Sequence, residues 1–187
     1  MSQRNLLRSQ LKQAWRNTIT TKYQNQLINS ERGLQVYFCS ELLQAFEENG
    51  VKRRIFVEPR VSARDVQDFR YPDIVICNTN RIIGIVELKY TPRIFAHYLK
   101  DLLTFDFVES HLNALTISND RFLGRTIDNR AFPLAPDAVL CWAGVYSGQW
   151  VDLSSKISHE LHARFLQLDA ITEKDQDPII YIDGKKD

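Results

Sequence analysis

The chain has 187 residues, of which 44% are hydrophobic and 25% are charged, and its net charge at pH 7 is +1. This composition is that of an ordinary globular domain and excludes a disordered or fibrous chain, and the small net charge argues against a protein that coats nucleic acid non-specifically. No apolar run approaches the roughly 20 residues of a membrane helix, and the N-terminal segment lacks the apolar core of a secretory signal, so we expect a cytoplasmic protein without membrane contact.

Residues 4–22 are predicted to form a helix, because Leu7, Leu11 and Trp15 recur at helical spacing. A parallel stripe of basic residues runs along the same segment and consists of Arg4, Arg8, Lys12 and Arg16. Residues 1–30 hold no acidic residue, whereas residues 169–187 hold six acidic residues against three lysines. Two interpretations of the stripe stay open: the solvated face of a packing helix, or a surface that faces phosphates.

A second helix is expected to begin at Asn29 or Ser30, which are favourable N-cap residues, and to end at Glu48, before Asn49 and Gly50. Its predicted buried face consists of Leu34, Phe38, Leu42 and Phe46.

Three strands are predicted to follow this helix. Residues 54–61 form the first, in which Pro59 marks either an edge strand or the strand's end. Residues 73–77 and 82–90 form two apolar strands joined by a polar Asn-Thr-Asn turn. The polar segment 61–72 between the first two strands is predicted to be a loop or a short helix.

The second half of the chain is predicted to alternate between helices and strands. Residues 93–110 suit a helix whose apolar residues are Phe95, Leu99, Leu102, Leu103 and Phe107. Residues 137–147 suit a buried strand, and residues 150–153 a further short strand. A last helix is expected from Ser154 or Ser155, with Ile157, Leu161, Phe165 and Leu168 on one side.

We therefore expect one mixed α/β domain over residues 1–187. It comprises an N-terminal basic helix (1–28), a core (29–153), and a C-terminal helix with an acidic tail (154–187). The three cysteines are widely spaced in apolar segments, which predicts reduced thiols and neither disulfides nor zinc ligands.

Two carboxylates and a lysine interrupt the apolar hairpin. With its turn centred near Thr79 or Asn80, antiparallel pairing sets Asp73 opposite Glu87, within one residue. Glu87 and Lys89 are two residues apart and share a face of the strand. Two close carboxylates repel each other and have raised pKa values unless a cation lies between them. Mg²⁺ resolves this, since it binds one or two carboxylates together with water and substrate phosphate.

A simpler interpretation of these residues needs no function. Lys89 can form an ion pair with Glu87 or Asp73 at the end of a strand, where such pairs are ordinary features of globular proteins.

The pairs Pro72-Asp73 and Glu87-Leu88-Lys89 resemble the signature of the PD-(D/E)xK phosphodiesterase superfamily, which includes restriction endonucleases and Holliday-junction resolvases. The order of predicted elements over residues 29–147 is similar to that of the family: a helix, a three-stranded meander, a helix and a strand. The resemblance implies a restriction-endonuclease-like α/β fold, in which helices flank a central mixed sheet with an antiparallel meander. The N-terminal helix is an addition to that core.

The resemblance also implies roles for individual residues. Asp73, Glu87 and the backbone carbonyl of Leu88 are expected to hold Mg²⁺, which Mn²⁺ can replace, and Lys89 to assist catalysis. Members tend to carry a glutamate on the first helix that leans toward the metal. Glu31 is the candidate for this second role in metal binding and catalysis, and Glu41 is the alternative.

By the same resemblance, the protein is expected to be a metal-dependent nuclease whose partner is DNA, with RNA as the alternative. Endonuclease action is favoured over exonuclease action, and a homodimer is allowed, because small members commonly cut duplexes as two copies. The predicted substrate-binding residues are Gln35, Arg53, Arg54, Arg70, Tyr98 and Lys100. Further basic residues around the first strand are Lys52, Arg60 and Arg64.

Two other classes of function stay open. A module with the same fold can bind DNA without chemistry. A regulatory partner protein can use its basic N-terminus and acidic tail for subunit contacts.

Overall fold

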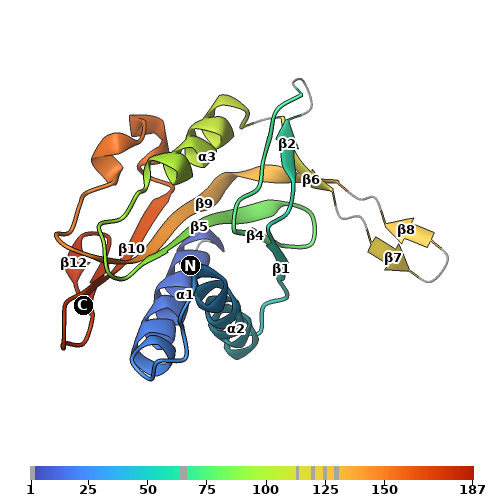
Figure 1. Ribbon diagram of the computed structural model, residues 1–187. Helices are drawn as coiled ribbons and strands as arrows, with labels where there is room; N and C mark the ends of the chain where they lie inside the picture. Colours follow the sequence, from blue (N-terminus) through green and yellow to red (C-terminus); the bar gives the residue numbers. More distant parts are fainter. Residues whose placement is uncertain (1–2, 64–66, 113, 119–120, 124–125, 129–130) are drawn as a thin grey trace.

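A mixed, open sheet runs through the computed structural model, which describes residues 3–63, 67–112, 114–118, 121–123, 126–128 and 131–187. Two helices, α1 and α2, lie against one face of the sheet, and α3 covers the other face (Figure 1). The strand order along the main path is β1-β4-β5-β9-β10-β11-β12. The predicted α/β class, with a central mixed sheet between helices and an N-terminal helix, is confirmed at this level.

The helices are α1 (Gln3–Asn17), which continues as a π-helical turn (Thr18–Tyr23), α2 (Glu31–Glu48) and α3 (Leu99–Ser110), with 3-10 turns at Ser154–Lys156 and His159–Leu161. The first strands are β1 (Arg54–Val57), β2 (Val61–Ala63), β3 (Phe69–Arg70), β4 (Ile74–Cys77), β5 (Ile82–Thr91) and β6 (Leu115–Ser118). The remaining strands are β7 (Arg121–Leu123), β8 (Thr126–Asp128), β9 (Ala131–Ser147), β10 (Phe165–Thr172), β11 (Ile179–Ile182) and β12 (Lys185–Lys186).

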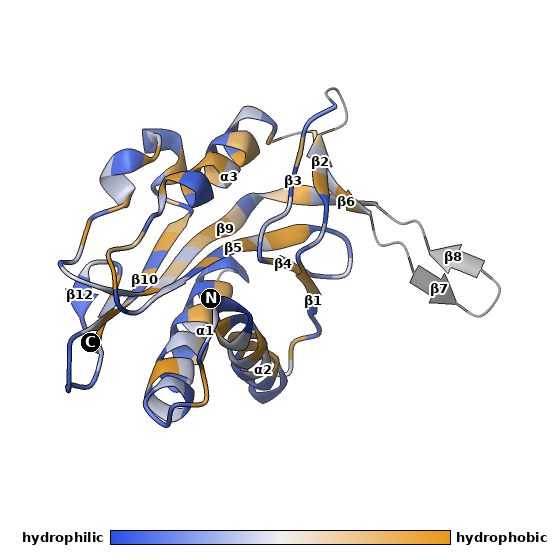
Figure 2. Cartoon of the chain, viewed as in Figure 1, coloured by the Kyte–Doolittle hydropathy of each residue, from blue (hydrophilic) through white to orange (hydrophobic). Residues whose placement is uncertain are grey.

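The sheet changes direction at its centre. β1, β4 and β5 pair antiparallel, as predicted for the hairpin. β5 then pairs parallel with β9, and β9 parallel with β10. In this register Glu87 lies beside Trp142, and Lys89 lies beside Gly144. The central strands are rich in hydrophobic residues (Figure 2), as expected for strands covered by helices on both faces.

The two N-terminal helices form the core beneath the sheet as their periodicity predicted. Leu7, Leu11 and Trp15 are almost completely buried, and the Trp15 ring meets Phe38 of α2 edge to face at 5.9 Å. The Ser30 hydroxyl caps α2 by accepting the N–H of Gly33, and Gly50, at φ 63°, ends it in a left-handed conformation that favours glycine. The predicted N-cap and helix end are therefore confirmed.

The basic stripe of α1 contacts the acidic end of the chain. Arg8 and Lys12 pair with Asp183 at 3.2 and 2.7 Å, and Arg16 pairs with Asp187. Trp15 also donates its indole N–H to the backbone carbonyl of Asp169 in β10. The two oppositely charged segments thus neutralise each other within one chain, and these three side chains do not form a free phosphate-binding surface.

The predicted C-terminal helix is wrong. Phe165–Thr172 is the strand β10, and all eight of its residues are buried. Ile157 lies beyond the first 3-10 turn, and Leu161 ends the second. A strand buried on both faces shows no polar–apolar alternation, so its apolar residues can match helical spacing by coincidence. Residues 150–153, predicted as a strand, have no regular structure.

Three further boundaries differ from prediction. α3 begins only at Leu99, and Leu99 and Leu103 are 72% and 56% exposed, so the predicted apolar face is wrong for these residues. The first predicted strand ends at Val57, before Glu58 adopts φ 47°. The segment predicted as a loop or helix contains β2 and β3, which pair antiparallel. Arg64 lies outside the described residues.

The structure bears on the predictions about membrane helices and about the cysteines. No helix in the described part of the chain is both long and apolar enough to cross a bilayer. The three cysteines are free thiols, as predicted. Burial raises the pKa of Cys39 to about 11 and that of Cys77 to about 12.

Gly144→Ala should destabilise the protein by about 2 kcal/mol or more, because a β-carbon there would overlap the six-membered ring of Trp142. That indole is 1% exposed and donates to Asp101, so it cannot move aside freely. Gly33→Ala is the matched control, since a β-carbon in α2 would meet only ordinary contacts and should stabilise by roughly 0.5 kcal/mol. Denaturant unfolding measures both changes, and equal stabilities for the two variants would contradict this account of Gly144.

Candidate active site

The start of β4 fixes the position of Asp73. Ile74 pairs with Val86, so the next antiparallel position sets Asp73 opposite Glu87, as the sequence predicted. The backbone carbonyl of Asp73 accepts the N–H of Glu58 at 3.0 Å and the side-chain amide of Gln35 at 2.9 Å. Gln35, predicted to bind substrate, is thus engaged in positioning the main chain of Asp73.

The side chains of Asp73 and Glu87 meet at this position. One carboxylate oxygen of Asp73 accepts the Leu88 N–H at 2.5 Å, and the carboxyl groups of Asp73 and Glu87 share a hydrogen bond. Burial raises the pKa of Asp73 to about 6, and the nearby Glu31 charge acts in the same direction. Burial and the charge of Asp73 raise the pKa of Glu87 well above its ordinary value. Without a cation, the pair therefore retains protons more strongly than ordinary carboxylates do.

Lys89 does not neutralise this pair. Its ammonium nitrogen lies 3.6 Å from a carboxylate oxygen of Glu31 and 3.8 Å from one of Asp101. Among the described residues, no basic side chain forms a salt bridge with Asp73 or Glu87. The simpler interpretation, in which Lys89 pairs with one of these two carboxylates, is therefore wrong.

A cavity of about 390 Å³ brings most of the predicted site together. It lies between β3, β5, α3 and the start of α2. The predicted residues that line it are Glu31, Arg70, Asp73, Glu87, Leu88, Lys89 and Lys100.

The structure also distinguishes between the two glutamates of α2. Glu31 accepts the backbone N–H of Tyr90 at 3.1 Å and faces Lys89. Glu41 instead contacts the N-terminal helical segment, where it pairs with Asn17 and with Lys22. Glu31, the first candidate, is therefore the glutamate beside the cavity.

Besides Gln35, three predicted substrate-binding residues do not line the cavity. Arg54 pairs with Cys77, four residues along β4 from Asp73 and thus roughly 13 Å away. Arg53 donates to Gln10 and lies over the Phe46 ring, and burial lowers its pKa to about 10. Tyr98 precedes α3 and faces Phe95 and Lys156.

Two buried polar residues of α3, Asp101 and Thr104, complete the cavity and were missed in the sequence. Asp101 accepts the Trp142 indole N–H at 3.1 Å, and burial raises the pKa of Asp101. Thr104 forms a hydrogen bond with Glu87. The signal was available: residues 101, 104 and 108 share one helical face, and the apolar Val108 at its end is buried.

The donor set fits a hard divalent cation. Among the residues that the structure describes, no three acidic, histidine or cysteine side chains are close enough to hold a metal ion by themselves. Mg²⁺, however, uses one or two carboxylates and completes its shell with water and phosphate. The N–H and C=O of one residue point to the same side of an extended strand, so the Leu88 carbonyl points toward Asp73, as its N–H does. Two buried carboxylates, which have no basic partner among the described side chains, supply the charge that such an ion needs.

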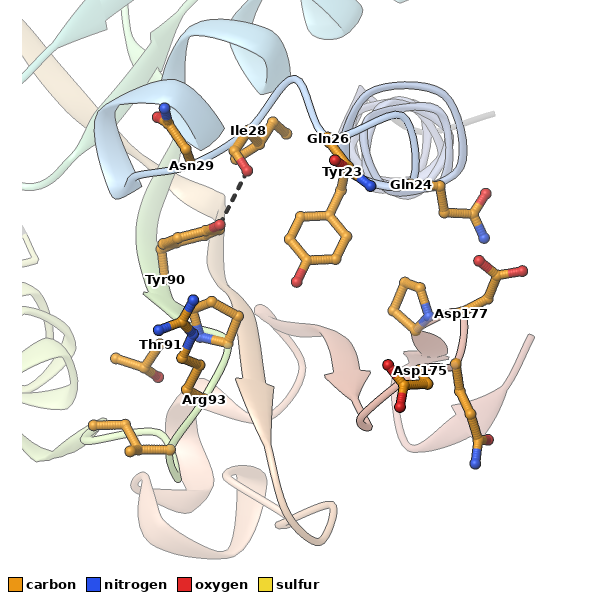
Figure 3. A pocket seen from close by; sticks show the side chains of 14 residues that line it. Tyr23, Gln24, Gln26, Ile28, Asn29, Tyr90, Thr91, Arg93, Asp175 and Asp177 are labelled. Atoms are coloured by element: carbon orange, nitrogen blue, oxygen red, sulfur yellow. Dashed lines mark hydrogen bonds between the residues drawn. The ribbon is translucent and has the colours of Figure 1, made fainter.

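A second, larger cleft of about 1070 Å³ opens nearby (Figure 3). Its walls are the turn before α2, the end of β5 and the loop between β10 and β11. Tyr90 connects the two regions, because its N–H contacts Glu31 whereas its hydroxyl donates to the Ile28 carbonyl at 3.0 Å. Neither Asp73 nor Glu87 lines this cleft.

Comparisons with protein-family models, with curated proteins and with solved structures found no match to this chain.

Asp73→Asn should stabilise the metal-free protein over wild type more strongly at pH 8 than at pH 5. Burial raises the pKa of Asp73 to about 6 in the folded protein. The stability that this raised pKa contributes is fully present below about pH 4 and is lost as the pH rises through about 6. The asparagine cannot ionise, which predicts a gain over wild type of roughly 1–3 kcal/mol at pH 8, about half of that at pH 5 and none below about pH 4.

Thermal and denaturant unfolding in EDTA measure this difference. Asp106→Asn, at an exposed position on α3, is the matched control for the change from a carboxylate to an amide. A constant difference between Asp73→Asn and wild type from pH 5 to pH 8 would contradict the shifted pKa of Asp73.

Proposed function

We propose that the protein is a divalent-metal-dependent nuclease that hydrolyses phosphodiester bonds in DNA. The observation that carries the proposal is the pair Asp73 and Glu87, which are buried together in the cavity that Lys89 also lines. Within the part of the chain that the structure describes, neither carboxylate forms a salt bridge with a basic side chain. The order α2, β1-β4-β5, α3 and a strand β9 parallel to β5 supports a restriction-endonuclease-like core. It matches the arrangement that the PD-(D/E)xK resemblance implies.

Asp73, Glu87 and the Leu88 carbonyl are the groups that would hold Mg²⁺ or Mn²⁺. When bound, such an ion polarises a phosphate oxygen and lowers the pKa of a water molecule. The raised pKa values of both carboxyls imply that cation binding releases protons, and hence that binding strengthens as pH rises.

Lys89 is positioned to act on the substrate. Glu31, from α2, and Asp101, from α3, hold its ammonium group from two different elements. In that position Lys89 can donate hydrogen bonds to phosphate oxygens or to an attacking water. Lys100 lines the same cavity and attracts the phosphate backbone, which positions the substrate without reading its sequence. Arg70, which also lines the cavity, forms a salt bridge with Asp68 at 2.6 Å.

Lys89→Ala and Asp73→Asn should separate catalysis from metal binding. Lys89→Ala is expected to lower the cleavage rate by about 100-fold or more, while Mg²⁺ affinity stays the same or increases, because Glu31 and Asp101 lose their cation. Asp73→Asn should lose both. Cleavage of plasmid and single-stranded DNA with Mg²⁺ or Mn²⁺ measures the rates, and calorimetric titration measures metal binding.

Asp106→Asn is the control, as an exposed carboxylate of α3 outside the cavity. Full cleavage by Asp73→Asn would refute the proposed metal site. DNA binding by the wild type without cleavage would instead identify a binding module, and neither binding nor cleavage would favour a regulatory partner protein.

A further inference from the structure

Three large apolar side chains remain exposed around the cavity that contains the carboxylates. Phe69, the first residue of β3, is 39% exposed, and Tyr71, which directly follows β3, is 58% exposed. Leu103 of α3 is 56% exposed. Single exposed apolar residues are ordinary, whereas several around one cavity indicate a binding surface. All three line the cavity of Asp73, Glu87 and Lys89.

The two rings form a packed unit. Phe69 and Tyr71 meet edge to face with their centroids 5.5 Å apart. On the strand pair β2–β3, Phe69 lies opposite Ser62, and the guanidinium of Arg60 lies 4.4 Å from the centre of the Phe69 ring. Aromatic side chains held in this way lose little conformational entropy when they bind a ligand.

The charges around the rings fit an anionic chain. Arg60 lies on Phe69 and Lys100 lines the cavity, whereas Arg70, which also lines it, forms a salt bridge with Asp68 at 2.6 Å. A ligand that matches this surface has flat apolar groups joined by negative charges, which describes a strand of nucleic acid.

We propose that Phe69, Tyr71 and Leu103 form a stacking surface for an unpaired base next to the scissile phosphate, so that the substrate has a single-stranded segment at the cleavage site. The position of the phosphate rests on the proposed nuclease function. Inside a duplex, neighbouring base pairs cover both faces of each base, and an exposed aromatic ring can stack only on a base that is unpaired or extruded.

The distance along the chain sets the register of this base. Tyr71 is two residues before Asp73, and two residues of extended chain span roughly 7 Å. The stacked base therefore belongs to the nucleotide whose phosphate lies at the carboxylates, or to its immediate neighbour.

The test measures binding without cleavage. Fluorescence anisotropy in EDTA compares labelled oligothymidylate with a labelled hairpin duplex of the same number of nucleotides. Wild type should bind oligothymidylate more tightly than the duplex. Tyr71→Ala and Phe69→Ala should each weaken binding of oligothymidylate by about 10-fold, the effect of losing one base–aromatic stack.

Two variants serve as controls. Tyr71→Phe keeps the ring and should bind like wild type, which separates stacking from hydrogen bonding by the hydroxyl. Leu99→Ala changes a residue of α3 that is 72% exposed and does not line the cavity, and it should also bind like wild type. Circular dichroism checks that every variant is folded.

Equal affinities of wild type and Tyr71→Ala for oligothymidylate would overturn the inference, as would duplex binding as tight as single-strand binding. If the protein cleaves DNA and Tyr71→Ala still binds normally, the stacking surface alone is refuted. If binding depends on Tyr71 but no substrate is cleaved, the stacking surface is supported and the nuclease proposal fails.

Discussion

Two hydrogen bonds to the main chain of Asp73, together with one from Leu88 to its side chain, force two carboxylates into contact. Glu58 and Gln35 hold the carbonyl of Asp73 at the start of β4, and the Leu88 N–H holds its carboxylate against β5. Glu87 is then opposite, buried and almost without solvent. Such an arrangement is costly in the ionised state unless a cation is available, and the rest of the cavity can be understood from that constraint.

The other charged groups of the cavity are arranged so that they do not remove the free-energy cost of ionising both carboxylates. Lys89 lines the same cavity as the pair, yet Glu31 and Asp101 hold its ammonium group from α2 and α3. Asp101 is in turn fixed by the indole of Trp142, whose six-membered ring occupies the space that a β-carbon at Gly144, two residues further along the same strand β9, would need. The strand β9 with its Gly144, together with α2 and α3, thus holds the Lys89 ammonium group in the same cavity as Asp73 and Glu87 but without a salt bridge to either. An ordinary structural ion pair needs none of this support.

The part of the site that lies within one hairpin could be predicted from the sequence. The Asn-Thr-Asn turn pairs Cys77 with Ile82, and a bulge directly beyond that pair shifts the register by one residue, which brings Asp73 opposite Glu87. Residues that reach the cavity from a helix were harder to identify. Asp101 and Thr104 were missed because the exposed Leu99 and Leu103 resembled a buried face.

Arg53 and Arg54 were misplaced for a different reason. They are basic and near in sequence, but a strand carries them away from the cavity. The pattern also could not identify β10, because a strand covered on both faces has no period of two. The pairing of the basic stripe with Asp183 and Asp187 depends on the position of β10 in the sheet, and no local sequence signal specifies that position.

The contact of α1 with β10 has a consequence for how the chain reaches this structure. Trp15 and the carbonyl it binds are 154 residues apart, so the apolar face of α1 emerges from the ribosome long before the strand that helps to cover it. Contacts of such sequence separation slow folding, and a nascent chain with an uncovered amphipathic helix is prone to aggregation. The basic residues on the outer side of α1 repel other copies of the same nascent segment during that interval. They can therefore protect the chain from aggregation until its own C-terminal strands are synthesised.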